Sequence, residues 1–410
     1  MKVAAVTAPL SRWRDDATDD PRRDTRTAAL LGIALGVSFG VCFLTGVYSH
    51  LAQNPTAWFE LPASPSTLYQ VTQGVHVAAG IATVPLLLAK LWAVFPHLFR
   101  WPPITGIAHA LERLTLVPLV AGSIFMLFSG LANTYLWYPL PVFFPTAHCW
   151  VAWLTIGALV THIGAKLTLT RRALTRPTAA TTPPPDRPVT TTTTTTTTAA
   201  PTTTPLVAES ADPTARRRFL AMVGAAAGVL TVATVGQTVY PLRRFALLAP
   251  RDPDVGTDGF PVNNTAGEAG ITDAASDPEW RLAVTGAVGA ALSLSLNDLR
   301  SLPQHEATLP IACVEGWSVT KRWRGVRLAD VLELAGAPPD ASVTMQSLER
   351  GLFGTSDVNA GQAHHPDTLL ALEVEGQVLS LDHGYPVRLI APNRPGVMQT
   401  KWLSTMEVRG

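Results

Sequence analysis

One cysteine in the second half of the sequence stands where a thiol could bind a metal. Cys313 ends the apolar run ATLPIAC and is followed closely by Glu315, Gly316 and Trp317. A thiol that leaves a strand into a glycine-containing turn is well placed to bind a soft metal, although a buried structural cysteine is the more common role of such a residue. Three cysteines this far apart predict neither a disulfide framework nor a structural zinc site.

A second group of polar residues follows in DHGYPVRLIAPNRPGVMQTKWLSTMEV, residues 382–408. Together with ACVEGWSVTKRWRGVRLADVL, residues 312–332, this segment resembles the molybdopterin-binding core of the sulfite oxidase family. The two motifs occur in the family's order, and with a weaker match at 280–286 they cover most of residues 260–408. The resemblance implies a molybdenum oxidoreductase domain.

The resemblance also implies roles for individual residues. Cys313 would supply the thiolate ligand to molybdenum, while His383, Arg388 and Lys401 would hold the phosphate and the polar edge of the pterin. Arginine and lysine suit this task because a buried phosphate needs charge-assisted donors.

Two further residues, Asn263 and Ser347, occupy places where the family has pterin contacts and are weaker candidates. The sequence departs from the family pattern at Glu375-Gly376, where the family has Asn-Gly, and no arginine-rich set matches a sulfite pocket. It ends at Gly410, where eukaryotic members continue into an immunoglobulin-like domain, so dimerisation through such a domain is not expected. The substrate is therefore left open.

Histidines in the apolar first half are candidate haem ligands, because histidine is costly within a bilayer. His148 and His162 are spaced so that one helix would present them near one face, about 21 Å apart in depth, which suits two stacked haems. His76 pairs most simply with His148, or with His162 if the helices are offset, and His50 lies nearer the outer surface. Histidines bonded to helix carbonyls or to each other are the structural alternative.

Apolar stretches that could carry these histidines occupy roughly 27–49, 69–97, 113–137 and 147–169. Each is long enough to cross about 30 Å of hydrocarbon as a helix. Residues 27–172 are therefore expected to form an all-α transmembrane bundle, and they resemble the four-helix b-type cytochrome subunits of membrane dehydrogenases. That resemblance implies one b haem, with a second left open, and a quinone or quinol partner.

Charge predicts the orientation of the chain. Residues 1–249 carry 19 Lys+Arg against 10 Asp+Glu, whereas residues 250–410 carry 12 against 20. By the positive-inside rule the N-terminal segment 1–26 and the Thr/Pro-rich linker at 173–215, which is expected to be disordered, are cytoplasmic.

A fifth apolar segment, 216–245, begins with the letters RRRFL. This start resembles a twin-arginine export signal placed inside the chain, and an ordinary positive-inside anchor is the alternative. Either one places residues 250–410 on the outer face of the membrane.

The outer segment, 250–410, is expected to fold as a mixed α/β domain. Short β-like runs at 280–286, 307–313, 342–348 and 386–392 are separated by Gly, Pro, Asn and Asp, and a helix is expected at 327–336. The whole chain is thus predicted to be multi-domain, with a transmembrane helical bundle and a mixed α/β molybdopterin-binding domain of the sulfite oxidase core type.

These features predict a membrane-bound oxidoreductase that exchanges electrons between the quinone pool, b haem and an external molybdopterin site. Analogy with exported sulfoxide reductases favours oxygen-atom transfer that reduces S- or N-oxides. A sulfite dehydrogenase running the opposite way is the main alternative. A metal-free binding module on a membrane scaffold and a transporter rank lower, and no nucleic-acid partner is expected.

Overall fold

The computed structural model describes residues 20–56, 58–98, 106–175, 213–351 and 353–410. The first 19 residues and nearly all of the linker expected at 173–215 lie outside the described residues, so its predicted disorder stays a prediction.

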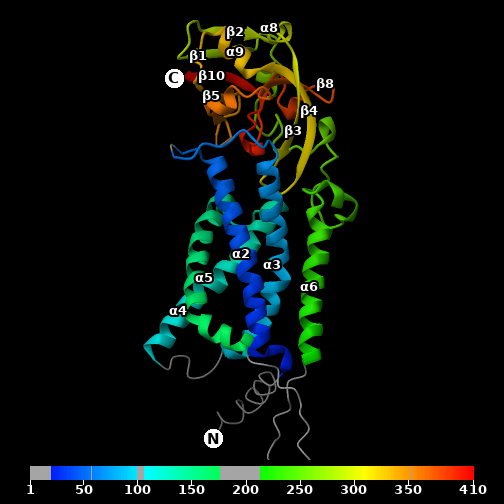
Figure 1. Ribbon diagram of the computed structural model, residues 1–410. Helices are drawn as coiled ribbons and strands as arrows, with labels where there is room; N and C mark the ends of the chain where they lie inside the picture. Colours follow the sequence, from blue (N-terminus) through cyan, green and yellow to red (C-terminus); the bar gives the residue numbers. More distant parts are fainter. Residues whose placement is uncertain (1–19, 57, 99–105, 176–212, 352) are drawn as a thin grey trace, which may run out of the picture.

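Five long helices lie side by side at one end of the molecule (Figure 1). They are α2 (Thr25–Gln53), α3 (Leu68–Leu98), α4 (Ile107–Thr134), α5 (Phe144–Thr175) and α6 (Pro213–Val235). All five are long and apolar enough to cross a membrane. Helix α2 packs against α3 and α5, and α4 packs against α5, which gives a four-helix bundle; α6 packs on the outside of this bundle, against α3.

The fifth helix ends earlier than the sequence suggested. Its apolar segment was expected to run through 245, but α6 stops at Val235 and a 3-10 helix, η2 (Tyr240–Phe245), follows a turn. Gly236 allows the turn, because a Cβ at this position would collide with the carbonyl oxygen of Leu242. The chain therefore folds back directly after α6.

The other end of the molecule is a mixed α/β domain with two five-stranded sheets, as predicted. The first sheet has the order β2-β1-β10-β5-β6, and the second has β3-β4-β7-β8 with β9 paired to β7. Only the pair of β1 with β10 is parallel among the described strand pairs. The strands are β1 (Arg281–Gly286), β2 (Leu292–Ser295), β3 (His305–Ala312), β4 (Ser318–Arg327), β5 (Ser342–Ser347), β6 (Thr355–Val358), β7 (Leu369–Val374), β8 (Gln377–Val378), β9 (Arg388–Ile390) and β10 (Leu403–Arg409).

Short helices fill the connections of this domain. They are α7 (Thr272–Ser276), α8 (Leu296–Ser301), α9 (Leu328–Leu334) and α10 (Ala360–Ala363), with 3-10 turns η3 (Thr257–Gly259), η4 (Leu381–His383) and η5 (Gly396–Met398); a further turn, η1 (Pro21–Arg23), precedes α2. All four predicted β runs coincide with strands, and the predicted helix with α9.

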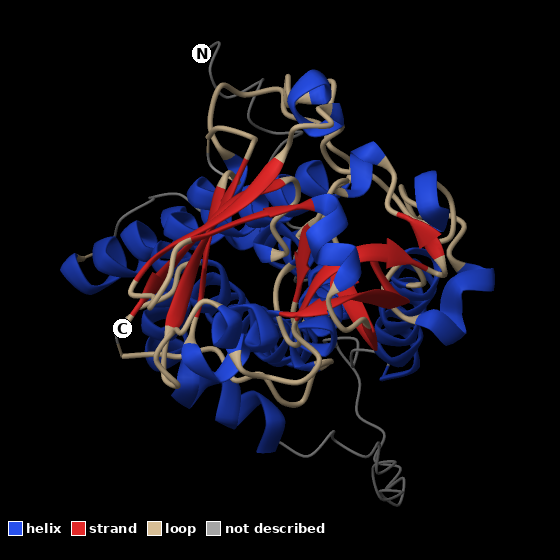
Figure 2. Cartoon of the chain, turned by 90° about the horizontal axis from the view of Figure 1, so that it is seen from above, coloured by secondary structure: helices blue, strands red, loops and turns tan. Residues whose placement is uncertain are grey.

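Two hydrophobic cores support the site. The larger core joins the first sheet to α9 through residues such as Leu282, Val331 and Met406. The smaller core surrounds Trp323 in the second sheet and includes Cys313. Figure 2, seen along the helices, shows the two sheets lying over the bundle. The metal-ligand candidate is therefore buried on a rigid sheet.

Candidate functional site

Cys313 directly follows β3 and is fully buried. Its backbone N–H donates to the carbonyl oxygen of Trp317 at 2.9 Å, and the N–H of Gly316 donates to the carbonyl oxygen of Cys313 at 3.1 Å. Gly316 has a φ of 89°, which glycine adopts without strain. These bonds close a tight turn that fixes the direction of the thiol.

The sulfur of Cys313 accepts hydrogen bonds from two groups. Asn263 Nδ2 lies 2.8 Å from Sγ, and the backbone N–H of Glu315 lies 3.4 Å from it. Burial raises the pKa of the thiol, followed by the charge of Glu315, while the two donors act in the opposite direction. A bound cation would hold the sulfur as thiolate, which these donors would also stabilise.

Membrane helices and the segment behind α6 hold the same turn from below. The hydroxyl of Thr238 donates to the carbonyl oxygen of Gly316, and the N–H of Ser318 donates to the carbonyl oxygen of Gln237 at 3.0 Å. Asn133, at the end of α4, donates to the carbonyl oxygen of Val314 at 3.1 Å. The shape of the Cys313 turn therefore depends on both halves of the chain.

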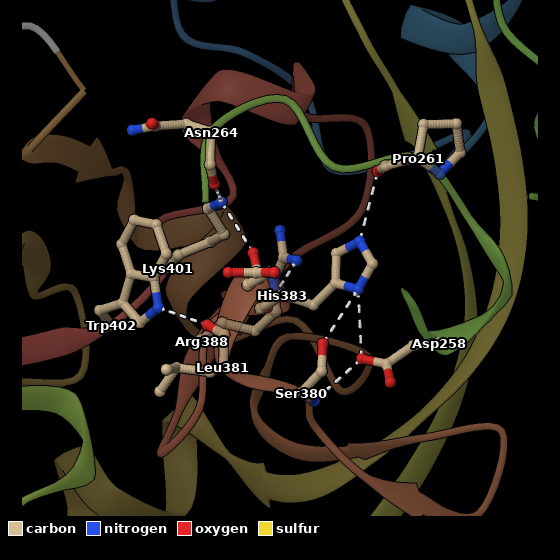
Figure 3. Close-up of polar contacts among 10 residues, drawn as sticks. Asp258, Pro261, Asn264, Ser380, Leu381, His383, Arg388, Lys401 and Trp402 are labelled. Carbon is tan, nitrogen blue, oxygen red and sulfur yellow. Dashed lines mark hydrogen bonds and ion pairs between the residues drawn. The ribbon is translucent and has the colours of Figure 1, made fainter. Parts of the chain in front are cut away.

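Arg388 and its partners form the buried basic wall of the site (Figure 3). The guanidinium is 4% exposed and donates to the carbonyl oxygens of His383, at 2.9 Å, and Gln399, at 3.0 Å. It lies 5.3 Å from the ring centre of Trp323. Burial lowers the pKa of Arg388 to about 9, so it stays charged at neutral pH. Among the described residues its buried Nε has no hydrogen-bond acceptor.

Lys401 lies next to this arginine. Its Nζ donates to the carbonyl oxygens of Asn264, at 2.5 Å, and Asp382, at 2.9 Å, and lies over the ring of Trp402 (Figure 3). Burial and then the charge of Arg388 lower the pKa of Lys401 to about 7. Two neighbouring buried cations oppose each other, and an anionic ligand would relieve that repulsion.

His383 is held by a stack and two polar groups. Its ring stacks on Phe260 at 3.7 Å between centroids. Nδ1 lies 3.2 Å from a carboxylate oxygen of Asp258, and Nε2 lies 3.3 Å from the carbonyl oxygen of Pro261 (Figure 3). Burial and then Arg388 lower the pKa of His383 to about 4. Burial therefore disfavours a third positive charge here, although both ring nitrogens face acceptor oxygens, those of Asp258 and Pro261.

One cavity of about 1180 Å³ connects this group to the membrane helices. In the outer domain its wall includes Cys313, Asn263, His383, Arg388 and Lys401. In the helical bundle the wall includes His50, His76 and His148. The structure thus brings eight of the ten candidate residues to one continuous space.

Two candidates lie elsewhere. Ser347 does not line the cavity; its hydroxyl donates to the carbonyl oxygen of Lys401 at 2.8 Å and supports the backbone there. His162 lies on α5 beyond Ile156, the last residue of this helix that lines the cavity. The pairing of His162 with His76 is not the arrangement found.

Three cavity residues were not singled out as site residues from the sequence. Glu315 is 7% exposed, receives a hydrogen bond from Trp317 Nε1 and lies 3.9 Å from Arg251. Asn133 and Tyr138 come from the end of α4 and the loop behind it. The only available signal for Glu315 was its place two residues after Cys313, and no local signal marks the other two.

The two histidines of α3 and α5 face each other within the bundle. The ring centroids of His76 and His148 are 6.2 Å apart. His76 Nδ1 lies 2.9 Å from the carbonyl oxygen of Cys42, so it must carry the proton. His148 Nδ1 lies 2.8 Å from Ser129 Oγ, whose own proton goes to the carbonyl oxygen of Phe125. Both rings therefore keep an unprotonated Nε2, which is the form that binds metals.

The residues present fit a molybdenum cofactor. Within the described ranges no group of three or more His, Cys, Asp or Glu side chains gathers as a metal site, so a metal at Cys313 would take its other ligands from a cofactor. The unpartnered Nε of Arg388 and the amine of Lys401 supply donors to the anionic part of such a cofactor.

Comparison with known proteins identifies the family of the outer domain. Residues 269–410 match the family model described as "Oxidoreductase molybdopterin binding domain". The "Uncharacterized oxidoreductase YuiH" of Bacillus subtilis is 32% identical over 148 residues, which are 36% of this chain and 72% of that protein. The chain therefore belongs to the molybdopterin-binding oxidoreductases and is an enzyme of that family.

Two other relatives point to different reactions. Rat mitochondrial sulfite oxidase is 37% identical over 161 residues, 32% of this chain and 30% of that protein. The "Putative protein-methionine-sulfoxide reductase subunit YedZ1" of Azospira oryzae is 34% identical over 164 residues, 39% of this chain and 61% of that protein. The chain spans less than half of the length of the sulfite oxidases that it matches, from 30% of the rat protein to 42% of the Arabidopsis thaliana protein.

Proposed function

We propose that this protein is a membrane-bound molybdenum oxidoreductase that takes electrons from quinol through a b haem and reduces S- or N-oxides at the outer domain. The single cavity that reaches both Cys313 and the pair His76 and His148 carries the proposal. On this account residues 1–26 and the linker are cytoplasmic, and the outer domain faces away from the cytoplasm.

The chain holds the molybdenum cofactor with groups of two kinds. Cys313 offers the thiolate, which Asn263 orients through its bond to Sγ. Arg388 and Lys401 bind the phosphate, and His383 binds the polar edge of the pterin. When bound, the cofactor supplies two-electron oxygen-atom transfer. The protein's part is to orient it, to keep bulk water out of the buried pocket and to leave one side open to substrate.

The histidine pair has the dimensions of a bis-histidine metal site. A metal bound by two imidazoles lies about 2.0 Å from each nitrogen, and each nitrogen lies roughly 1.1 Å from its ring centre, which gives a centroid separation of about 6.2 Å. The observed separation is 6.2 Å. A Cβ at Gly46 would lie 3.2 Å from His76 Cε1, so glycine lets this ring pack against α2. These features support one haem at His76 and His148.

The charge of the pocket favours reduction of a neutral substrate over oxidation of sulfite. Glu315 is buried two residues from Cys313 and lines the cavity, and the nearby cations Arg388 and Lys401 are committed to the cofactor. Glu315, with Arg251 3.9 Å away, offers no net positive charge that would attract a dianion such as sulfite. The name of the Azospira relative supports the same direction.

The test follows the direction of electron transfer by the absorbance of the haem. Purified protein is half-reduced without oxygen, and one portion receives methyl p-tolyl sulfoxide while another receives sulfite. Oxidation of the haem by the sulfoxide is the expected result. Reduction of the haem by sulfite would reverse the proposed direction, and protein without haem absorbance would rule out the role given to the membrane helices.

A further inference from the structure

The molybdenum pocket has a wall that the outer domain does not supply. Asn133 and Tyr138, from the end of α4 and the loop before α5, line the same cavity as Cys313 and Glu315. Asn133 Nδ2 donates at 3.1 Å to the carbonyl oxygen of Val314, the residue between those two. The end of α4 is therefore fastened directly to the Cys313 turn.

The same asparagine holds the phenol of Tyr138. The hydroxyl donates to Asn133 Oδ1 at 3.3 Å, longer than the roughly 2.7 Å usual for O–H···O bonds, so a better acceptor can replace this one. The ring packs edge to face against the buried Phe144 at 5.3 Å. The side chain is half exposed. The ring of Tyr138 is therefore held in place by Phe144, while its hydroxyl hydrogen can rotate toward a ligand in the pocket.

Backbone strain accompanies this arrangement. Leu136, in the turn that leads from α4 to Tyr138, has a φ of 53°, a conformation that is strained for a residue other than glycine. Burial raises the pKa of the Tyr138 phenol, and the charges of Glu315 and Cys313 raise it further. The phenol is consequently a proton donor throughout the physiological range.

We propose that Tyr138, positioned by Asn133, is the substrate-binding donor that the membrane domain contributes to the molybdenum pocket, and that its ligand is the oxygen of a small uncharged sulfoxide. This proposal rests on the proposed function. The cavity wall also includes the apolar residues Leu136, Phe143 and Phe353. Such a wall suits apolar substituents on the sulfur, whereas Glu315 disfavours anions.

The experiment measures binding apart from turnover. The full-length oxidised protein has no electrons to give, so methyl p-tolyl sulfoxide binds without reacting, and calorimetric titration yields its Kd. Tyr138→Phe removes one hydrogen bond and is expected to weaken binding about 3- to 10-fold. Asn133→Leu should weaken it similarly, because the phenol loses its support. Haem absorbance and molybdenum content, measured on each variant, should match the wild type for Tyr138→Phe.

A matched control lies in the same turn. Tyr135 is as exposed as Tyr138, but its hydroxyl donates to the carbonyl oxygen of Leu248 and it does not line the cavity. Tyr135→Phe should bind the sulfoxide like the wild type. Equal Kd values for Tyr138→Phe and the wild type would overturn the proposal, whereas a wild type that binds no sulfoxide would overturn the proposed reductase function as well.

Discussion

Asn393 joins the outer domain to the membrane helices, and its replacement gives a quantitative test of that junction. The side chain is buried, accepts from the backbone N–H of Tyr69 at 2.7 Å and donates to the carbonyl oxygen of Pro62 at 2.6 Å and to the hydroxyl of Tyr48 at 3.0 Å. Its φ is 52°, which asparagine tolerates better than most residues.

Asn393→Ala should destabilise the protein through two separate effects. Leaving a buried donor or acceptor unpaired costs about 1–3 kcal/mol per group, and Tyr69 N and Pro62 O are the groups at risk. An alanine in the left-handed region costs about 1–2 kcal/mol more. The expected loss is about 3–8 kcal/mol, and at roughly 2–4 °C per kcal/mol for a domain of this size the melting temperature should fall by about 6–32 °C.

Tryptophan fluorescence during heating in detergent measures this change. Asn393→Gly separates the two effects, because glycine adopts the backbone conformation freely while losing the same hydrogen bonds, so it should melt above the alanine variant. The exposed Asn297→Ala, in α8 of the same domain, should shift stability by no more than about 0.5 kcal/mol. A melting temperature within about 2 °C of the wild type for Asn393→Ala, or a glycine variant less stable than the alanine variant, would refute this account.

Three further predictions concern the cofactors. Cys313→Ser should abolish sulfoxide reduction while leaving the haem spectrum intact; unchanged turnover would remove Cys313 from the mechanism. Gly46→Val should displace the His76 ring and lower the haem content of the purified protein several-fold, whereas Gly40→Val, on the same helix with open space around it, should not. The pKa of Lys401 is low, about 7, so its amine loses its proton as the pH rises from 7 to 9 in the empty site. Phosphate binds the charged form of the amine. Retention of molybdopterin on dialysis should therefore fall by up to about tenfold per pH unit. Lys401→Arg keeps its charge and should flatten that dependence, and an unchanged slope in this variant would assign it to another group.

Secondary structure was predictable from the sequence where the residues of a segment determine its conformation. Apolar length alone marks the five helices, and alternation with turn residues marks strands such as β1 and β5. The end of α6 was missed, because Gly236 reads as one of several small residues in an apolar run and only the returning chain at Leu242 reveals why a side chain is excluded there.

The candidate site was predictable in part, for a related reason. His383, Arg388 and Lys401 lie within one short motif whose backbone brings them together. Ser347 had the right place in the sequence, but its strand turns the hydroxyl toward the backbone of Lys401. Tyr138 could not be found, because it reaches the cavity beside Cys313 only through the docking of the two domains, which Asn133 fixes by its bond to Val314.

The contacts between the two domains shape the Cys313 turn. The carbonyl oxygens of Val314 and Gly316 and the N–H of Ser318 are all satisfied by Asn133, Thr238 and Gln237, which belong to α4 and to the segment behind α6. An outer domain separated from the helices would present these groups of the Cys313 turn to water, and the turn would lose the bonds that shape it. Helix α6 therefore does more than anchor the outer domain, since the residues that follow it help to position the metal-ligand candidate above the His76 and His148 pair.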